Sequence, residues 1–186
     1  NKFKETYVYD MPNVRTKKDD SYKAGHKLKN EIKNFVLHHT AYDNPITNEA
    51  EVKKQFMTPG QNSSHVVIEE DGSRTIYASP EQVSFHAGKS KWNGREDVND
   101  FSIGVEFQGD TQKKPLTDQQ VISFVEYYAP IAKKYNLNLK SIITHEQIRN
   151  AYIKKHADEK GLETKPDITY NQYKRILNYM KAKGIN

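Results

Sequence analysis

The chain has 186 residues, a hydrophobic fraction of 35%, an aromatic fraction of 11%, a formal net charge of +5 and no cysteine. This length fits one domain with a single core, and the 12 tyrosines argue against a disordered chain. The lack of cysteine excludes disulfides, cysteine-ligated zinc and a thiol nucleophile, so only histidine and carboxylate side chains could hold a zinc ion.

The positive charge comes from lysines scattered along the sequence, which would attract any polyanion weakly. A nucleic-acid-binding domain is therefore an alternative, but the basic residues are not clustered with aromatic ones, and we expect no nucleic-acid partner. No apolar run approaches the roughly 20 residues that span a bilayer, so we expect no membrane span. Asn1 stands where a start methionine would, which favours a removed leader and export to the periplasm, the cell envelope or the medium.

Short apolar runs and helix-capping patterns alternate along the sequence. The runs are typical of buried strands, and an Asp-Gly pair between two of them is typical of a hairpin turn. At three places a capping residue is followed three positions later by Glu or Gln, a pattern that indicates the start of a helix. The expected elements are an irregular arm at 1–33, strands at 35–37, 65–68, 75–77, 101–107 and 141–144, and helices that begin near Asn48, Thr117 and Thr169.

This alternation, without an internal repeat, predicts an α/β single domain with a mixed central sheet flanked by helices. His38 and His145 each follow a predicted strand directly, so both would lie at a sheet edge and could bind one metal. A third ligand would leave one tetrahedral position for a water molecule. By spacing alone Asp167, His156 and Asp158 are all candidates for that ligand.

Six motifs follow one another in fixed order, at 38–41, 64–68, 85–88, 92–96, 99–109 and 144–149. Together they resemble the zinc-dependent N-acetylmuramoyl-L-alanine amidases. This group includes phage amidases and peptidoglycan recognition proteins, and the nearest likeness is to the anhydromuramoyl-peptide amidases. The likeness spans about residues 34 to 180 and would make residues 34–186 the catalytic domain.

The resemblance implies one zinc ion per chain, bound by His38, His145 and Asp167. It also implies that Glu106 acts on the attacking water and that Lys165, two residues before Asp167, stabilises the oxyanion. The segment between His145 and Lys165 is longer than in the recycling enzymes, and the residues after Asp167 differ from the usual pattern.

Three further residues are expected to line the substrate cleft. The resemblance places His86 near the metal, and Trp92 and Arg95 could stack on a sugar or pair with a peptide carboxylate. His65 is expected to be structural.

The expected activity is hydrolysis of the amide bond between the lactyl group of N-acetylmuramic acid and L-alanine, in peptidoglycan or its fragments. The alternative is a binding module of the same fold that recognises muropeptides without cutting them. We expect a monomer.

Overall fold

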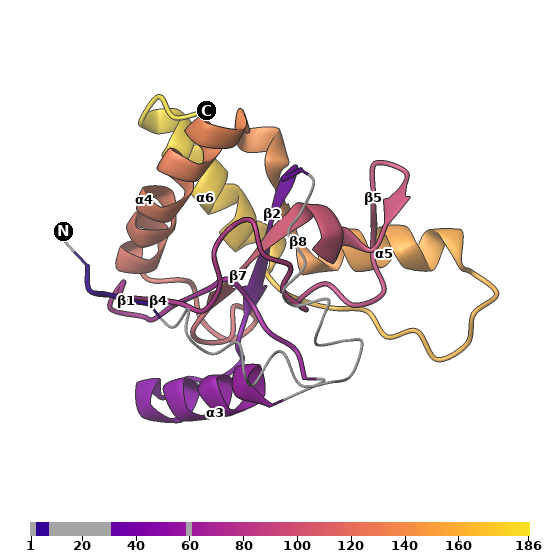
Figure 1. Cartoon of the computed structure of the whole chain (residues 1–186), viewed down its shortest axis with the longest axis horizontal. Helices are drawn as coiled ribbons and strands as arrows, with labels where there is room; N and C mark the ends of the chain where they lie inside the picture. Colours follow the sequence, from indigo (N-terminus) through magenta and orange to yellow (C-terminus); the bar gives the residue numbers. More distant parts are fainter. Residues whose placement is uncertain (1–2, 8–30, 59–60) are drawn as a thin grey trace.

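A six-stranded mixed sheet forms the centre of the computed structural model, which describes residues 3–7, 31–58 and 61–186 (Figure 1). The strands are β1 (Glu5–Tyr7), β2 (Asn34–His39), β3 (Val66–Ile68), β4 (Arg74–Ile76), β7 (Ser102–Phe107) and β8 (Ile142–Thr144), in the spatial order β1-β4-β3-β7-β2-β8. The helices are α3 (Pro45–Met57), α4 (Asp118–Tyr135), α5 (His145–Lys155) and α6 (Tyr170–Ala182), and a small hairpin is made of β5 (Lys91–Trp92) and β6 (Arg95–Glu96). The predicted α/β domain with a mixed sheet is confirmed.

The two faces of the sheet are covered differently because side chains alternate along each strand. On β2, Phe35 and Leu37 join the main core, to which α4 and α6 contribute their apolar stripes. Val36 lies on the opposite face with Phe101 and Ile148. Helix α3 packs onto that second face, and Figure 1 shows it on the other side of the sheet from α4 and α6.

The candidate site lies on the second face, at the end of the sheet where three neighbouring strands finish. Strands β7, β2 and β8 run parallel, so their carboxyl ends lie at one edge of the sheet. The register pairs His38 with Glu106, and Leu37 with Thr144, the residue directly before His145. Ligands of α/β proteins bind at such an edge.

The predicted start of one helix was wrong, and part of the predicted arm is a strand. Helix α3 begins at Pro45 with Asn44 as its N-cap, whereas Asn48 lies inside the helix and its Nδ2 donates to Glu69 Oε1 at 2.9 Å. The predicted irregular arm lies mostly outside the described residues, at 8–30, but its described part includes strand β1, which pairs with β4 and extends the sheet. The capped start of α4 at Thr117 and the Asp-Gly hairpin are confirmed.

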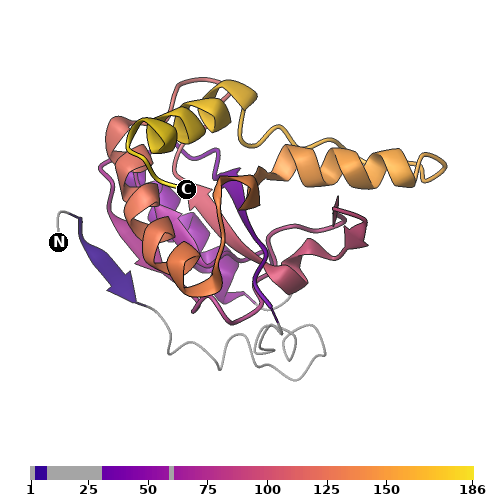
Figure 2. The same cartoon turned by 90° about the horizontal axis from the view of Figure 1, so that it is seen from above.

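Helix α5 was missed in the sequence. It begins at His145, where Thr144 and Gln147 form a reciprocal capping box. Figures 1 and 2 both show α5 running away from the sheet. Arg149 fastens it to neighbouring segments, because its guanidinium donates to Lys89 O at 2.8 Å and to Glu163 O at 3.0 Å. No helix in the described part of the chain has the length and apolarity to cross a membrane.

Glu69 gives a pH-dependent prediction about stability. Burial raises its pKa from 4.5 to about 7, more than the hydrogen bond from Asn48 lowers it. Since the folded state binds this proton more tightly, stability is lost as the pH rises from about 4.5 to about 7. Allowing for solvent screening, Glu69→Gln should gain about 1–2 kcal/mol over the wild type across this window. Urea unfolding at a series of pH values measures the difference, and a constant difference would contradict it.

Candidate metal centre

Three side chains from separate parts of the chain meet at the carboxyl edge of the sheet. His38 Nδ1 lies 3.1 Å from His145 Nδ1 and 3.2 Å from Asp167 Oδ2, and His145 Nδ1 lies 3.1 Å from the same oxygen. Ligand atoms of a tetrahedral zinc, each about 2.0–2.1 Å from the metal, are separated by roughly 3.3 Å. The three atoms already have nearly this spacing.

The protonation of this cluster also suits a metal ion. His145 Nε2 lies 3.2 Å from the carbonyl oxygen of Ala87, so the neutral ring would donate its one proton there and leave Nδ1 bare. Burial lowers the pKa of His38 to about 4, because it disfavours the charged ring more than Asp167 favours it. Neutral imidazoles and a carboxylate are the forms that bind a metal. This donor set, in a chain without cysteine, fits zinc.

Glu106 lies beside His38 on the neighbouring strand. Its Oε2 is buried and has no hydrogen-bond partner among the described residues. Burial raises the pKa of Glu106 well above its usual value, and the charge of Asp167 raises it further. An unpaired carboxyl oxygen beside a metal-binding cluster fits a general base better than a structural ion pair.

One cavity joins these groups and also contains Lys165. Helix α3 forms one wall with Val52 and Phe56, which were not among the predicted site residues; their i, i+4 spacing indicates only a packed helix face. The complete lining is His38, His39, Thr40, Tyr42, Val52, Gln55, Phe56, Asn62, Ser63, His86, Glu106, His145, Lys165 and Asp167. The structure therefore brings together six predicted site residues, including both proposed catalytic ones.

His86 reaches the same cavity but is a buried neighbour of His38. Its Nδ1 lies 3.0 Å from His38 Nε2, and its Nε2 lies 3.1 Å from Ser102 Oγ. Only 6% of its surface is exposed. His86 therefore contacts a candidate ligand as well as lining the cavity, a contact that the sequence did not predict.

Two other histidines have local roles. His65 Nδ1 accepts from the backbone N–H of Gly104 at 2.9 Å, and its Nε2 donates to Gln82 O at 2.7 Å, so the expected structural role is confirmed. His39 Nδ1 lies 2.9 Å from Thr111 Oγ1, and burial lowers the pKa of His39.

Trp92 and Arg95 do not line the metal cavity, and their role in binding substrate stays a prediction. They lie on the β5–β6 hairpin and line a separate depression with Glu31 and Phe101. The Arg95 guanidinium stacks over the Phe101 ring at 4.4 Å and makes an ion pair with Glu31 at 2.5 Å. These contacts occupy the polar group that was expected to bind a substrate carboxylate.

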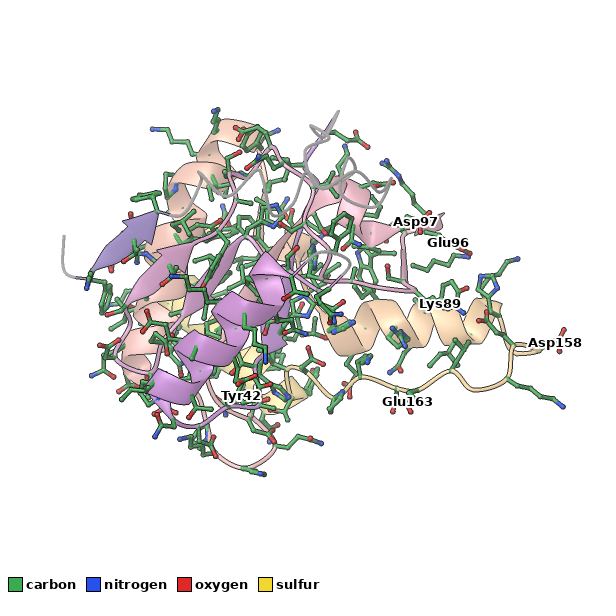
Figure 3. The ribbon with its side chains drawn as sticks, turned by 60° about the horizontal axis from the view of Figure 1, so that its bottom comes forward. Tyr42, Lys89, Glu96, Asp97, Asp158 and Glu163 are labelled. Carbon is green, nitrogen blue, oxygen red and sulfur yellow. The ribbon has the colours of Figure 1, made fainter. Side chains whose placement is uncertain are left out.

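The two rival ligand candidates lie elsewhere. His156 stacks on Tyr152 with ring centroids 4.0 Å apart, and its Nε2 lies 2.7 Å from Glu96 Oε2. Figure 3 shows Asp158 at the tip of the projection formed by α5 and its following loop, far from Tyr42 in the cavity wall. Among the described residues, Asp167 is the carboxylate grouped with His38 and His145.

A two-histidine, one-carboxylate cluster beside a buried glutamate, at the carboxyl edge of an α/β sheet, is the arrangement of a metal-dependent hydrolase. The family profile described as N-acetylmuramoyl-L-alanine amidase matches residues 28–161, more than half of the chain. The chain belongs to this family. The match ends before Lys165 and Asp167, so these residues rest on the geometry alone.

Curated relatives agree with this assignment. The chain is 41% identical over 73 residues to the 1,6-anhydro-N-acetylmuramyl-L-alanine amidase AmpD of Haemophilus influenzae, covering 39% of each protein. It is 29% identical over 123 residues to AmpD of Enterobacter cloacae, covering 66% of this chain and 61% of the relative. The chain therefore spans less than two thirds of the length of these relatives. These relatives do not favour the predicted export of the chain.

Solved structures share the fold over most of the chain. A selenomethionine AmpD derivative superposes with a TM-score of 0.58 at 18% identity, covering 94% of both chains. PlyL superposes with a TM-score of 0.59 at 15% identity, covering 95% of this chain and 97% of PlyL. The amidase AmiD from E. coli, in complex with anhydro-N-acetylmuramic acid-L-Ala-D-γ-Glu-L-Lys, has a TM-score of 0.57 at 20% identity, covering 80% of this chain and 58% of AmiD.

Proposed function

We propose that this chain hydrolyses the amide bond between the lactyl group of N-acetylmuramic acid and L-alanine in peptidoglycan fragments, with one zinc ion per chain. The observation that carries the proposal is the convergence of His38, His145 and Asp167 within 3.2 Å of one another, with Glu106 on the adjacent strand. Zinc bound by these three residues would supply a Lewis acid and lower the pKa of a coordinated water to about 7.

The residues of the chain would handle the protons and the developing charge. Glu106 takes a proton from the attacking water and returns it to the alanine nitrogen as the amide bond breaks. The Lys165 ammonium lies in the same cavity and stabilises the oxygen of the lactyl carbonyl as it becomes negative.

Lys165→Met tests the proposed oxyanion role. The variant keeps much of the length of the side chain but removes its charge, so kcat should fall by about 10²- to 10³-fold, as for other oxyanion donors. Zinc content should stay at the wild-type level, because Lys165 is not a proposed ligand. Steady-state kinetics and elemental analysis measure the two effects. A variant with normal kcat would refute the role.

The substrate class follows from the relatives that the chain resembles. AmpD is named for 1,6-anhydro-muramyl peptides, and AmiD was solved with such a fragment, so we propose soluble anhydro-muropeptides as the preferred substrate. The complete set of metal-binding side chains favours hydrolysis over the binding-module alternative.

The test is digestion of intact sacculi and of soluble anhydro-muropeptides by the zinc-loaded chain, with mass analysis of the products. Release of peptides that begin with L-alanine, at about one zinc per chain, is the expected result. Binding of muropeptides without cleavage would support the recognition module instead. Cleavage of sacculi alone would leave the activity intact but refute the preference for soluble fragments.

A further inference from the structure

We propose that His86, itself oriented by Ser102, is a positioning residue that holds the His38 ring in the tautomer whose bare Nδ1 faces Asp167 and the metal. The role of the metal in this inference rests on the proposed function. The assignment of the tautomer rests on the hydrogen bonds alone.

The orientation starts at Ser102, which has one proton to give. Its hydroxyl lies 2.6 Å from Val98 O, and a carbonyl oxygen can only accept, so Ser102 Oγ donates there. The same Oγ lies 3.1 Å from His86 Nε2 and can only accept from it. His86 therefore carries its proton on Nε2, and its Nδ1 is an acceptor.

The second step transfers this orientation to His38. His86 Nδ1, as an acceptor, lies 3.0 Å from His38 Nε2, so the His38 proton lies on Nε2. His38 Nδ1 is then bare, and it is the atom that lies 3.2 Å from Asp167 Oδ2. The relay from Val98 to His38 has one consistent arrangement of protons when both rings are neutral.

The neighbouring residue orients the other histidine of the cluster. Ala87 O accepts from His145 Nε2 at 3.2 Å, which leaves His145 Nδ1 bare as well. Two bare nitrogens and a carboxylate oxygen, all within 3.2 Å of one another, repel until a cation lies among them. Consecutive residues, His86 by its side chain and Ala87 by its backbone, thus prepare both histidines for a metal.

The position of His86 is fixed on two sides. Asn99 Oδ1 accepts from the backbone N–H groups of His86 at 3.0 Å and of Ala87 at 2.8 Å. The His86 ring lies directly on the backbone of Gly104, where a Cβ atom would come within 2.5 Å of its Cγ. A side chain at Gly104 would displace the ring. This close fit argues that the ring is held for its contacts and does not merely fill space.

Imidazole nitrogen NMR on the metal-free 186-residue chain tests the tautomer directly near pH 8, which lies above the reference pKa of histidine of about 6.5. The expected result is a protonated Nε2 and a bare Nδ1 on both His38 and His86. His65 is an internal reference, because backbone groups fix its proton on Nε2. A proton on His38 Nδ1 would overturn the proposal. The measurement needs no substrate, so its failure is distinct from the absence of amidase activity.

Zinc affinity, measured by competition with a chelator, tests the consequence. His86→Leu should weaken zinc binding roughly 10- to 100-fold, the usual effect of losing the partner of a ligand. His86→Asn should recover most of that loss, because its Oδ1 can accept from His38 Nε2. Ser102→Ala keeps the ring and should cost roughly 2- to 10-fold, with His86 and His38 showing mixed tautomers while His65 is unchanged. Wild-type affinity in His86→Leu, or an Asn variant no better than Leu, would overturn the proposal.

Discussion

Glu106→Gln should lower kcat by about 10²- to 10⁴-fold, the usual contribution of a general base. Glutamine has nearly the same shape as glutamate but cannot take a proton from water. Glu106 Oε2 is buried without a partner in the described part of the chain, so the substitution breaks no hydrogen bond recorded for that oxygen. The fold and the zinc content should therefore stay at wild-type values. Single-turnover cleavage of a soluble muropeptide and elemental analysis measure activity and metal separately.

Glu69→Gln is the matched control for this substitution. Glu69 is also half-buried, with an unpartnered buried Oε2 and a raised pKa, but it does not line the metal cavity. The control should keep full activity. Normal turnover in Glu106→Gln would refute the proposed base. An equal loss of turnover in both variants would show that replacing any buried glutamate lowers activity, so that Glu106 has no special role.

Local sequence patterns predicted the two histidines of the site, His38 and His145, because each stands at the end of an apolar run. Apolar runs before His38 and His145 indicate buried strands, and a residue directly after a buried strand must lie at the edge of the sheet. The register of β2 with β7 then places Glu106 beside His38. The pairing of these strands was not predicted from the sequence, and Glu106 was chosen there through the family resemblance alone.

The third side chain of the cluster could not be chosen in this way. Asp167 follows a projecting helix and a loop, and it returns to the site through a contact between distant segments, in which the Glu146 N–H donates to Asp167 O at 2.9 Å. Spacing along the chain does not encode such a return. The capping pair Thr144 and Gln147 was the signal that could have located the start of α5, and it would have shown that His156 lies at the end of a helix that starts at His145.

Residue type alone could not place Trp92 and Arg95 relative to the metal cavity. An aromatic residue close to an arginine is typical of a sugar-binding wall. Here the arginine stacks on Phe101 and pairs with Glu31, a residue assigned to the N-terminal arm. Glu31 is distant from Arg95 in sequence, so the local motif could not reveal this ion pair.

Asp167→Ala should weaken zinc binding by more than about 100-fold. This exceeds the loss expected for a residue that only hydrogen-bonds a metal ligand, such as His86. The substitution removes the only carboxylate among the three grouped side chains and leaves two neutral imidazoles. Zinc at about 100 times its Kd should stabilise the wild type by about 2.7 kcal/mol, and this stabilisation should be absent in the variant. Chelator competition and thermal unfolding with and without zinc measure both effects.

His156→Ala distinguishes His156 from Asp167 as the third ligand, because the His156 ring contacts Glu96 and does not line the metal cavity. Its loss should leave zinc affinity and turnover unchanged, since a surface ion pair of this kind contributes about 0–1 kcal/mol to stability. If His156→Ala loses zinc while Asp167→Ala keeps it, the assignment of the third ligand is wrong. A loss confined to Asp167→Ala would show that the loop after α5 returns to complete the metal centre.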